Sequence, residues 1–188
     1  MLLIKNANLY TPKHLGNKDI LLGGGKILAI GDQIEPDNSL HECWDAEGKI
    51  ITPGFIDQHM HVIGAGGKRG FASMTPEIKV TDLISCGTTT VVGLLGTDGS
   101  TRSIKSLYAK VQALETEGVS AYMYTGYYGL EPVHLMDNVQ DEMIFIEKVL
   151  GCKIAITDIR SSYPTDLELL RLLRQVRTGG MIGGKKGI

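Results

Sequence analysis

From Pro53 onward, segments typical of buried strands alternate with segments typical of amphipathic helices. The strand-like segments are 54–62, 88–96, 119–128 and 152–159, and the helix-like segments are 76–87, 101–118, 141–151 and 165–180. Regular alternation of this kind is typical of βα units around a parallel sheet, whose strands are covered on both faces and are therefore almost continuously apolar. The repeat predicts an α/β fold for residues 53–188.

Local signals define the expected helices. In the segment 101–118, apolar residues recur at three- and four-residue steps, at Ile104, Leu107, Val111 and Leu114. Glycine follows three of the helix-like segments, at Gly87, Gly118 and Gly151, the residue type preferred just after a helix. Thr165 or Asp166 is the expected N-cap of the last helix. Residues 179–188 are expected to form a loop and the start of a fifth strand.

Residues 1–52 contain only strand-like runs, at 2–10, 19–31 and 42–52. Turn-forming residues separate these runs, among them Pro12, Gly23–Gly25 and Pro36–Ser39. The pattern is compatible with the N-terminal part of a small β-sandwich, and equally with hairpins packed on the following domain. We therefore predict two domains, 1–52 and 53–188.

Two arrangements accommodate repeated βα units: an open, doubly wound sheet and a closed (β/α)₈ barrel. A dinucleotide-binding doubly wound sheet carries a glycine fingerprint in its first βα turn. Here the first turn carries His-Met-His, at residues 59–61, and no GxGxxG opens a helix. The sequence therefore favours a TIM-type (β/α)₈ barrel, of which about four βα units are present.

Composition excludes several classes of function. The net charge is −2 without a basic block, and 6% of residues are aromatic, so nucleic acid and anionic membranes are not expected partners. No segment has the length of a membrane span, and the apolar N-terminal stretch is too short for a signal peptide. The three cysteines are far apart and form no CxxC pair, which favours a reduced, cytoplasmic location. We also expect a homo-oligomer.

His59 and His61 are the candidate metal ligands. Residues i and i+2 of a strand point to the same face, so both imidazoles and the carboxylate of Asp57 would project together. At the carboxyl end of the first barrel strand, two imidazoles can chelate a Zn²⁺-like ion. A chance pair of histidines is the alternative. The glycine-rich stretch that follows, Gly64–Gly70, favours the metal site because it lets backbone approach a ligand closely.

The other three histidines, His14, His41 and His134, are expected in surface loops. Two imidazoles do not complete a catalytic zinc site, which normally has three protein ligands. No HExxH motif is present to supply the rest. The residues alone therefore leave the third ligand undefined.

The segment PGFIDQHMH, residues 53–61, resembles the first-strand signature of the amidohydrolase superfamily. Within that superfamily, FIDQHMHVIGAGG, VVGLLGTDG, YTGYY and KIAITDIRS together are similar to the isoaspartyl (β-aspartyl) dipeptidase family. The resemblance runs along essentially all 188 residues and corresponds to the N-terminal half of such an enzyme. It implies a β-sandwich beside the barrel, a small peptide or amide substrate, and a binuclear zinc site that hydrolyses isoaspartyl dipeptides.

The resemblance also implies roles for individual residues. His59 and His61 match the ligands of the more buried metal. Lys153 matches a carbamylated lysine whose carboxylate bridges two Zn²⁺ ions, a modification in which a neutral amine takes up CO₂. The pattern of apolar residues alone places Lys153 near the start of its strand, so its assignment rests on the resemblance.

Several matched positions contact substrate in the family. Tyr128 would donate a hydrogen bond to the carbonyl oxygen as negative charge develops there, and Arg160 would bind a substrate carboxylate. The remaining implied substrate-binding residues are Gly66, Gly67, Lys68 and Thr97. Each has a structural alternative: Thr97 as a helix cap, Tyr128 as a core residue and Arg160 as an ion-pair partner.

Lys68 departs from the family pattern. The family has a glutamate there that holds the α-ammonium of the substrate, and a lysine would repel an ammonium. Either recognition of the free amine is lost, or the substrate presents an anion at this position. A related amidohydrolase acting on another linear or cyclic amide is therefore an alternative function.

The family's two further histidine ligands and its catalytic aspartate follow later strands, beyond the 188 residues. A third alternative is therefore an inactive truncated half-barrel, persisting as a binding module.

Overall fold

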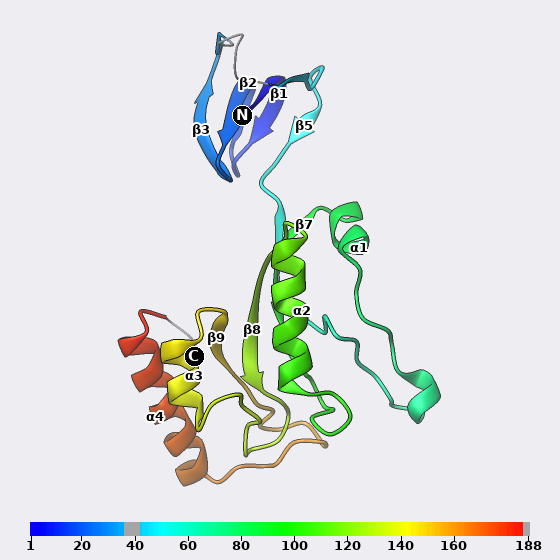
Figure 1. Ribbon diagram of the computed structural model, residues 1–188, viewed down its shortest axis with the longest axis vertical. Coiled ribbons are helices and arrows are strands. Elements are labelled where there is room, and N and C mark those ends of the chain that lie inside the picture. Colours follow the sequence, from blue (N-terminus) through cyan, green and yellow to red (C-terminus); the bar gives the residue numbers. More distant parts are fainter. Residues whose placement is uncertain (36–41, 186–188) are drawn as a thin grey trace. The chain divides into compact units, whose positions relative to one another are not determined.

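The computed structural model describes residues 1–35 and 42–185. They form two compact units, Met1–Gly54 and Phe55–Ile188 (Figure 1). The predicted turn at Pro36–Ser39 and the predicted loop residue His41 lie outside the described residues.

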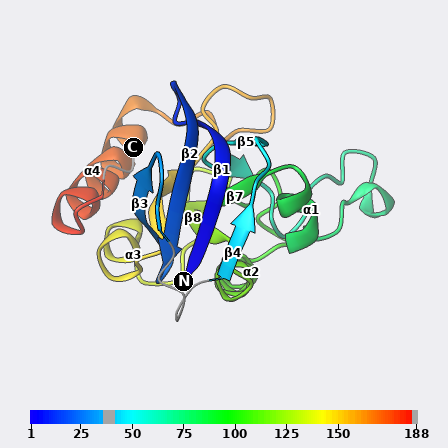
Figure 2. The ribbon, with the colours of Figure 1, turned by 90° about the horizontal axis from the view of Figure 1, so that it is seen from above.

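The first unit is a five-stranded sheet (Figure 2). Its strands are β1 (Leu2–Tyr10), β2 (His14–Gly23), β3 (Lys26–Gly31), β4 (Glu42–Asp45) and β5 (Ile50–Ile51), in the order β3-β2-β1-β4, with β5 also paired to β1. Its small core contains Ala7, Leu9, Ile20 and Ala46. The strand-only character expected for this segment is confirmed. His14 begins β2, so its predicted loop position is wrong, whereas His134 does lie in a loop. Membership of a β-sandwich stays a prediction.

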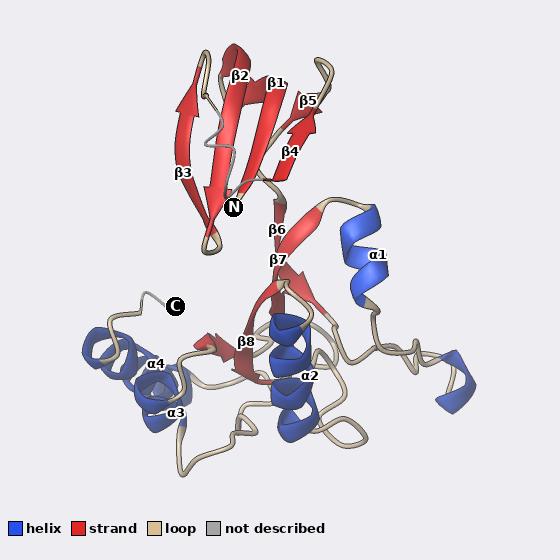
Figure 3. Cartoon of the chain, turned by 45° about the horizontal axis from the view of Figure 1, so that its top comes forward, coloured by secondary structure: helices blue, strands red, loops and turns tan. Residues whose placement is uncertain are grey.

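The second unit is built on a parallel sheet of β6 (Phe55–Met60), β7 (Thr88–Gly93), β8 (Ser120–Gly126) and β9 (Val149–Lys153). The strands lie in sequence order, β6-β7-β8-β9, and Figure 3 labels the first three of them. A doubly wound sheet reverses direction at a switch point between its halves. Here each crossover moves one strand further in the same direction, as in a barrel.

In the described residues, η1 (Phe71–Ser73), α1 (Val80–Ser85), α2 (Ile104–Thr116) and α3 (Val139–Phe145) lie between these strands, and α4 (Asp166–Ile182) follows β9. Helix α1 contacts β7, α2 contacts β8, and α3 and α4 contact β9 and each other. Their apolar faces and the strands share one core, which includes Leu83, Val91, Leu107, Met123 and Val176. Among the described residues, no helix has the length and apolar character needed to cross a membrane.

The first helix of this unit is shorter than predicted, because it begins only at Val80. The residues before it are tied to the preceding loop by their backbone. The amide of Thr75 donates to the carbonyl of Ala65 at 2.7 Å, and that of Ile78 donates to Val62 at 3.1 Å. These bonds hold the segment before Val80 along the loop, and Lys79 has an extended backbone, so the prediction of a helix over 76–87 is wrong for residues 76–79.

The predicted boundary between the third helix and the fourth strand is also wrong. Helix α3 ends at Phe145, and Val149–Lys153 pairs with β8, with Val149 beside Met123 and Lys153 beside Gly126. Gly151 therefore lies inside a strand and does not cap a helix. Most of the predicted strand 152–159 is loop, and Lys153 is the last residue of β9.

Helix α4 begins after Thr165, whose side chain and Glu168 form a capping box. The helix continues through Gly179 and Gly180, where a loop was predicted. A Cβ on Gly179 would lie 2.9 Å from the carbonyl oxygen of Gln140, so glycine allows α4 to pack closely on α3. Residues 186–188 of the predicted fifth strand lie outside the described part of the chain.

Candidate metal centre and substrate pocket

The His-Met-His segment lies at an irregular end of β6. The register with β7 pairs Asp57 with Val91 but Met60 with Gly93, so three steps along β6 oppose two along β7. Bulges of this kind redirect side chains next to functional sites. The carboxylate of Asp57 accepts a hydrogen bond from the backbone amide of His59 at 2.9 Å. Asp57 therefore shapes the backbone beside His59.

The two histidine rings lie close together. Their centroids are 5.7 Å apart and their planes are inclined by 59°. Strand β6 ends at Met60, which packs against the core. His61 is therefore the first residue after the strand. The structure thus brings the two predicted metal ligands to one place, with Met60 on the core side as the strand alternation predicts.

The ring of His61 sits directly against Gly96, in the loop after β7. Gly96 has a φ of +73°, and a Cβ there would lie 2.3 Å from Nε2 of His61. Only glycine satisfies both the backbone conformation and the contact. Burial lowers the pKa of His61, and the nearby charges of His59, Lys153 and Arg102 lower it further. The lowered pKa favours the neutral imidazole, which is the form that binds metals.

Backbone hydrogen bonds join the loops at the carboxyl ends of the strands. The amide of Tyr128 donates to the carbonyl of Gly96 at 3.0 Å, and the amide of Ala155 donates to the carbonyl of Tyr128 at 3.3 Å. At the end of β9, Nζ of Lys153 lies 5.4 Å from the centroid of the Tyr128 ring. His61, Tyr128 and Lys153 therefore occupy the same edge of the sheet.

The donor set fits a divalent metal centre only if Lys153 is modified. Within residues 1–35 and 42–185, no three His, Cys, Asp or Glu side chains gather as a metal site. His59 and His61 supply two imidazoles beside Lys153. A lysine ammonium is a donor without acceptor capacity, whereas its carbamate carries two oxygens that suit a bridging position. The residues present fit half of a binuclear centre in that form.

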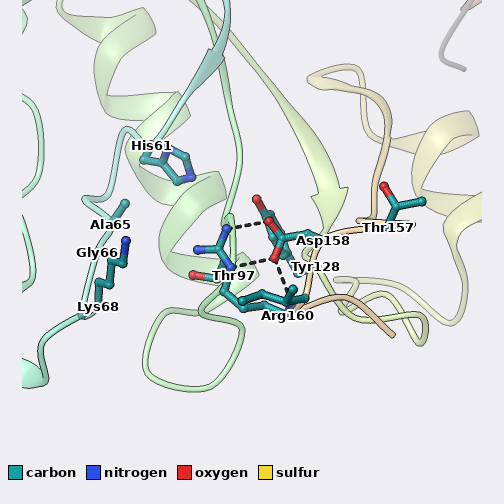
Figure 4. Close-up of a pocket in the computed structure, with 11 residues that line it drawn as sticks. His61, Ala65, Gly66, Lys68, Thr97, Tyr128, Thr157, Asp158 and Arg160 are labelled. Carbon is teal, nitrogen blue, oxygen red and sulfur yellow. Dashed lines mark hydrogen bonds and ion pairs between the residues drawn. The ribbon is translucent and has the colours of Figure 1, made fainter. Parts of the chain in front are cut away.

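A pocket of about 820 Å³ opens beside this edge (Figure 4). It is lined by His61, Ala65, Gly66, Gly67, Lys68, Thr97, Tyr128, Thr157, Asp158, Ile159 and Arg160. All six residues predicted to bind substrate are among them, and they come from the loops after four consecutive strands. His59 and Lys153 are not among the lining residues.

Thr97 does not cap α2, because the N-cap is Ser103. The roles of these residues stay predictions.

Arg160 is held by a residue that the sequence interpretation missed. Its Nε and Nη2 donate to the two carboxylate oxygens of Asp158 at 2.7 and 2.6 Å, and Cζ lies 5.4 Å from the Tyr128 ring centroid. Hydrogen bonds from Arg160 lower the pKa of Asp158 to about 2. The pair leaves Nη1 of Arg160 unengaged by Asp158. The sequence signal that could have revealed this ion pair is an acidic residue, Asp158, two positions before Arg160.

Arg102 is a second residue that sequence reasoning missed. Its guanidinium donates to the carbonyl of Ile63 at 2.5 Å and to that of Thr75 at 3.1 Å. Both carbonyls belong to the long connection between β6 and α1, which carries the glycine-rich wall of the pocket. Arg102 thus anchors that connection to the segment before α2.

The chain is similar to known proteins, and the similarity bears on the function of this sheet edge. No protein-family model matches the chain. A crystal structure of β-aspartyl dipeptidase from Fervidobacterium islandicum AW-1, in complex with β-Asp-Leu, is 45% identical, with a TM-score of 0.93 over 100% of this chain and 50% of that one. A D-hydantoinase from Thermus sp. is 22% identical, with a TM-score of 0.63 over 94% of this chain and 38% of its own, and shares the fold.

Curated dihydroorotases are similar over a shorter stretch. Those of Listeria welshimeri and Staphylococcus aureus (strain MRSA252) are 42% identical over 69 residues and 40% over 68, which is 36% of this chain and 16% of each relative. Together the comparisons support the amidohydrolase superfamily. The predicted α/β fold class is confirmed: the parallel sheet and helices of the second unit match part of the barrel in these amidohydrolase neighbours. The chain spans about half the length of the dipeptidase structure.

Proposed function

We propose that this amidohydrolase chain supplies half of a binuclear, metal-dependent active site that hydrolyses β-aspartyl dipeptides. The observation that carries the proposal is the strand-end arrangement of His61, Tyr128 and Lys153 beside the pocket. The full-chain likeness to a β-aspartyl dipeptidase bound to β-Asp-Leu supports the substrate class. Homo-oligomeric assembly and a cytoplasmic location stay predictions.

In this proposal His59, His61 and carbamylated Lys153 hold the metal ions, with Zn²⁺ the expected species. When bound, such ions polarise an amide carbonyl and lower the pKa of water. Lys153 must lose its proton before its amine can take up CO₂ as a carbamate.

The pocket residues bind and orient the substrate. The hydroxyl of Tyr128 donates to the carbonyl oxygen of the scissile amide, where negative charge develops during the reaction. Arg160, held by Asp158, uses its remaining N–H groups to bind a substrate carboxylate. The backbone at Gly66 and Gly67 lets the substrate approach the loop closely, and Thr97 offers a hydroxyl beside it.

Hydrolysis of a different amide is the second candidate function. Two observations favour it: the similarity to dihydroorotases over 69 residues, and a lysine, Lys68, in the wall of the pocket. Dihydroorotate is a cyclic amide without a free amine, so Lys68 would not oppose its binding.

The direct test is an assay of the protein expressed from its full reading frame and supplied with Zn²⁺ and bicarbonate. Release of leucine from β-Asp-Leu, absent after treatment with a chelator and restored by Zn²⁺, is the expected result. Opening of dihydroorotate or a hydantoin without cleavage of β-Asp-Leu would favour the second candidate. A metal-loaded protein that hydrolyses none of these compounds would refute both.

A further inference from the structure

Positively charged side chains outnumber carboxylates among the described residues that line the pocket. Its charged lining residues are Lys68, Arg160 and Asp158. Both carboxylate oxygens of Asp158 already accept hydrogen bonds from Arg160. Among the described lining residues, no carboxylate is therefore left to bind a positively charged group of a substrate.

Lys68 lies on the other side of the pocket from Asp158 and Arg160 (Figure 4). It belongs to a tight turn in which the amide of Gly70 donates to the carbonyl of Gly67 at 3.0 Å. Its ammonium makes no ion pair or hydrogen bond with a residue that the structure describes. Arg69, the next residue of the turn, is exposed and does not line the pocket. Of these two adjacent cations, only Lys68 therefore lines the pocket.

We propose that Lys68 makes this site prefer substrates with two carboxylates and no free ammonium, such as amino acids N-acylated by a dicarboxylic acid, over β-aspartyl dipeptides, which carry an ammonium as well. This inference rests on the proposed function, because it names the substrate class of the same site. One carboxylate is bound by Lys68 and the other by the unengaged N–H groups of Arg160. A substrate ammonium on the Lys68 side would meet a like charge, and no carboxylate among the described lining residues would compensate for it.

Succinyl-leucine and β-Asp-Leu form a matched pair of probes. Both have the same two carboxylates and the same scissile amide, and they differ only in the ammonium of the aspartyl group. In each hydrolysis, water adds to the carbonyl carbon, the C–N bond breaks, and the leaving nitrogen takes up a proton. The products are leucine and either succinate or aspartate. Any difference between the probes therefore reports on the ammonium.

The experiment measures kcat/KM and, by calorimetry, Kd for both probes with the full-length, Zn²⁺-loaded protein. The wild type should favour succinyl-leucine by on the order of tenfold, since a partly exposed charge contributes modestly. Lys68→Glu should reverse the preference and Lys68→Gln should reduce it. Arg69→Glu makes the same charge change outside the pocket and should leave the preference within about twofold of the wild type.

The proposal would be overturned by a wild type that binds β-Asp-Leu more tightly than succinyl-leucine, or by a Lys68→Glu variant whose preference is unchanged. Binding of neither probe would also overturn it. Failure of the proposed function gives a different result, in which both probes remain intact while the Kd values still report the preference. The binding measurement thus separates substrate selection from turnover.

Discussion

The two sides of the pocket are built in different ways. The side with His61, Tyr128 and Lys153 consists of strand ends whose loops are joined by backbone hydrogen bonds. The opposite side, residues 64–79, contains only the short helix η1 and is anchored by Arg102. Regular elements position side chains accurately, whereas loops tolerate substitution. In our proposal, the metal chemistry therefore belongs to the sheet edge, and the choice between substrates with and without an ammonium belongs to the loop.

Replacing Lys153 should have the largest effect if the sheet edge holds the metals. Lys153→Ala removes the proposed bridging ligand, and we expect kcat/KM for the substrate that is cleaved to fall by on the order of 10³-fold or more. Lys148→Ala is the matched control, because Lys148 pairs with Glu115 at 2.6 Å and is not a pocket residue. Equal losses in the two variants would argue against a special role for Lys153.

Removing the hydroxyl of Tyr128 tests the same side without touching a metal ligand. Tyr128→Phe should lower kcat by roughly 10²- to 10³-fold with little change in KM, since the lost hydrogen bond forms as charge develops on the carbonyl oxygen. Steady-state kinetics measure both constants. Tyr127→Phe deletes the hydroxyl of the neighbouring tyrosine, which packs against the core, and should leave kcat nearly unchanged. A normal kcat in Tyr128→Phe would exclude this role.

A methyl group at Gly96 should disturb His61 through packing alone. Gly96→Ala places a Cβ 2.3 Å from Nε2 of His61, whereas Gly118→Ala introduces the same residue at a φ of +94° with nothing within 4 Å. Both variants should lose about 1 kcal/mol of unfolding free energy. Only Gly96→Ala should also lose activity, by about 10²-fold, because the ring of His61 is displaced. Thermal unfolding measures the loss of stability, and steady-state kinetics measure the loss of activity. Equal losses of activity in Gly96→Ala and Gly118→Ala would contradict the contact between Gly96 and His61.

The smallest expected effect concerns the orientation of Arg160. Asp158→Asn should raise KM by roughly tenfold while changing kcat little, because the guanidinium loses its charged partner. Asp32→Asn, which removes an ion-paired aspartate from the first unit, should leave KM unchanged. A large fall in kcat with an unchanged KM would instead indicate that Asp158 acts in the reaction itself.

The pH dependence of KM follows from the same pair. The pKa of Asp158 is lowered to about 2, so this carboxylate stays charged between pH 5 and 8 and contributes no change in KM there. A lowered acid pKa means that the ion pair contributes fully above the unfolded value of about 3.9 and is lost as the pH falls through about 2. If KM rose sharply between pH 6 and pH 5 in the wild type but not in Asp158→Asn, the lowered pKa of Asp158 would be contradicted.

The order of strands and helices was predictable, because apolar periodicity is a property of long segments. The position of Lys153 within its strand was not. Residues 149–151 and 154–156 are both apolar, and periodicity cannot distinguish which of them pairs with β8. Only the pairing of Lys153 with Gly126 places the lysine at the carboxyl end of the sheet. The resemblance to a family pointed to Lys153 as a metal ligand where the pattern did not, and that role stays a prediction.

Contacts between loops that are far apart along the chain could not be predicted from the sequence either. The glycine clusters predicted close approaches, yet nothing in them indicated that Gly96 faces His61. Likewise, Arg102 contacts carbonyls that lie 27 and 39 residues away along the chain. Such contacts depend on how the loops meet at the sheet edge, which local propensities do not encode.

Metal content is the most direct test of the claim that the strand ends form half of a binuclear centre. The full-length protein, loaded with Zn²⁺ and bicarbonate and then desalted, should contain about two zinc ions per chain by elemental analysis. Lys153→Ala should fall to about one or fewer, because the bridging oxygens are gone. Equal zinc content in the wild type and Lys153→Ala, or a wild type without zinc, would contradict the account.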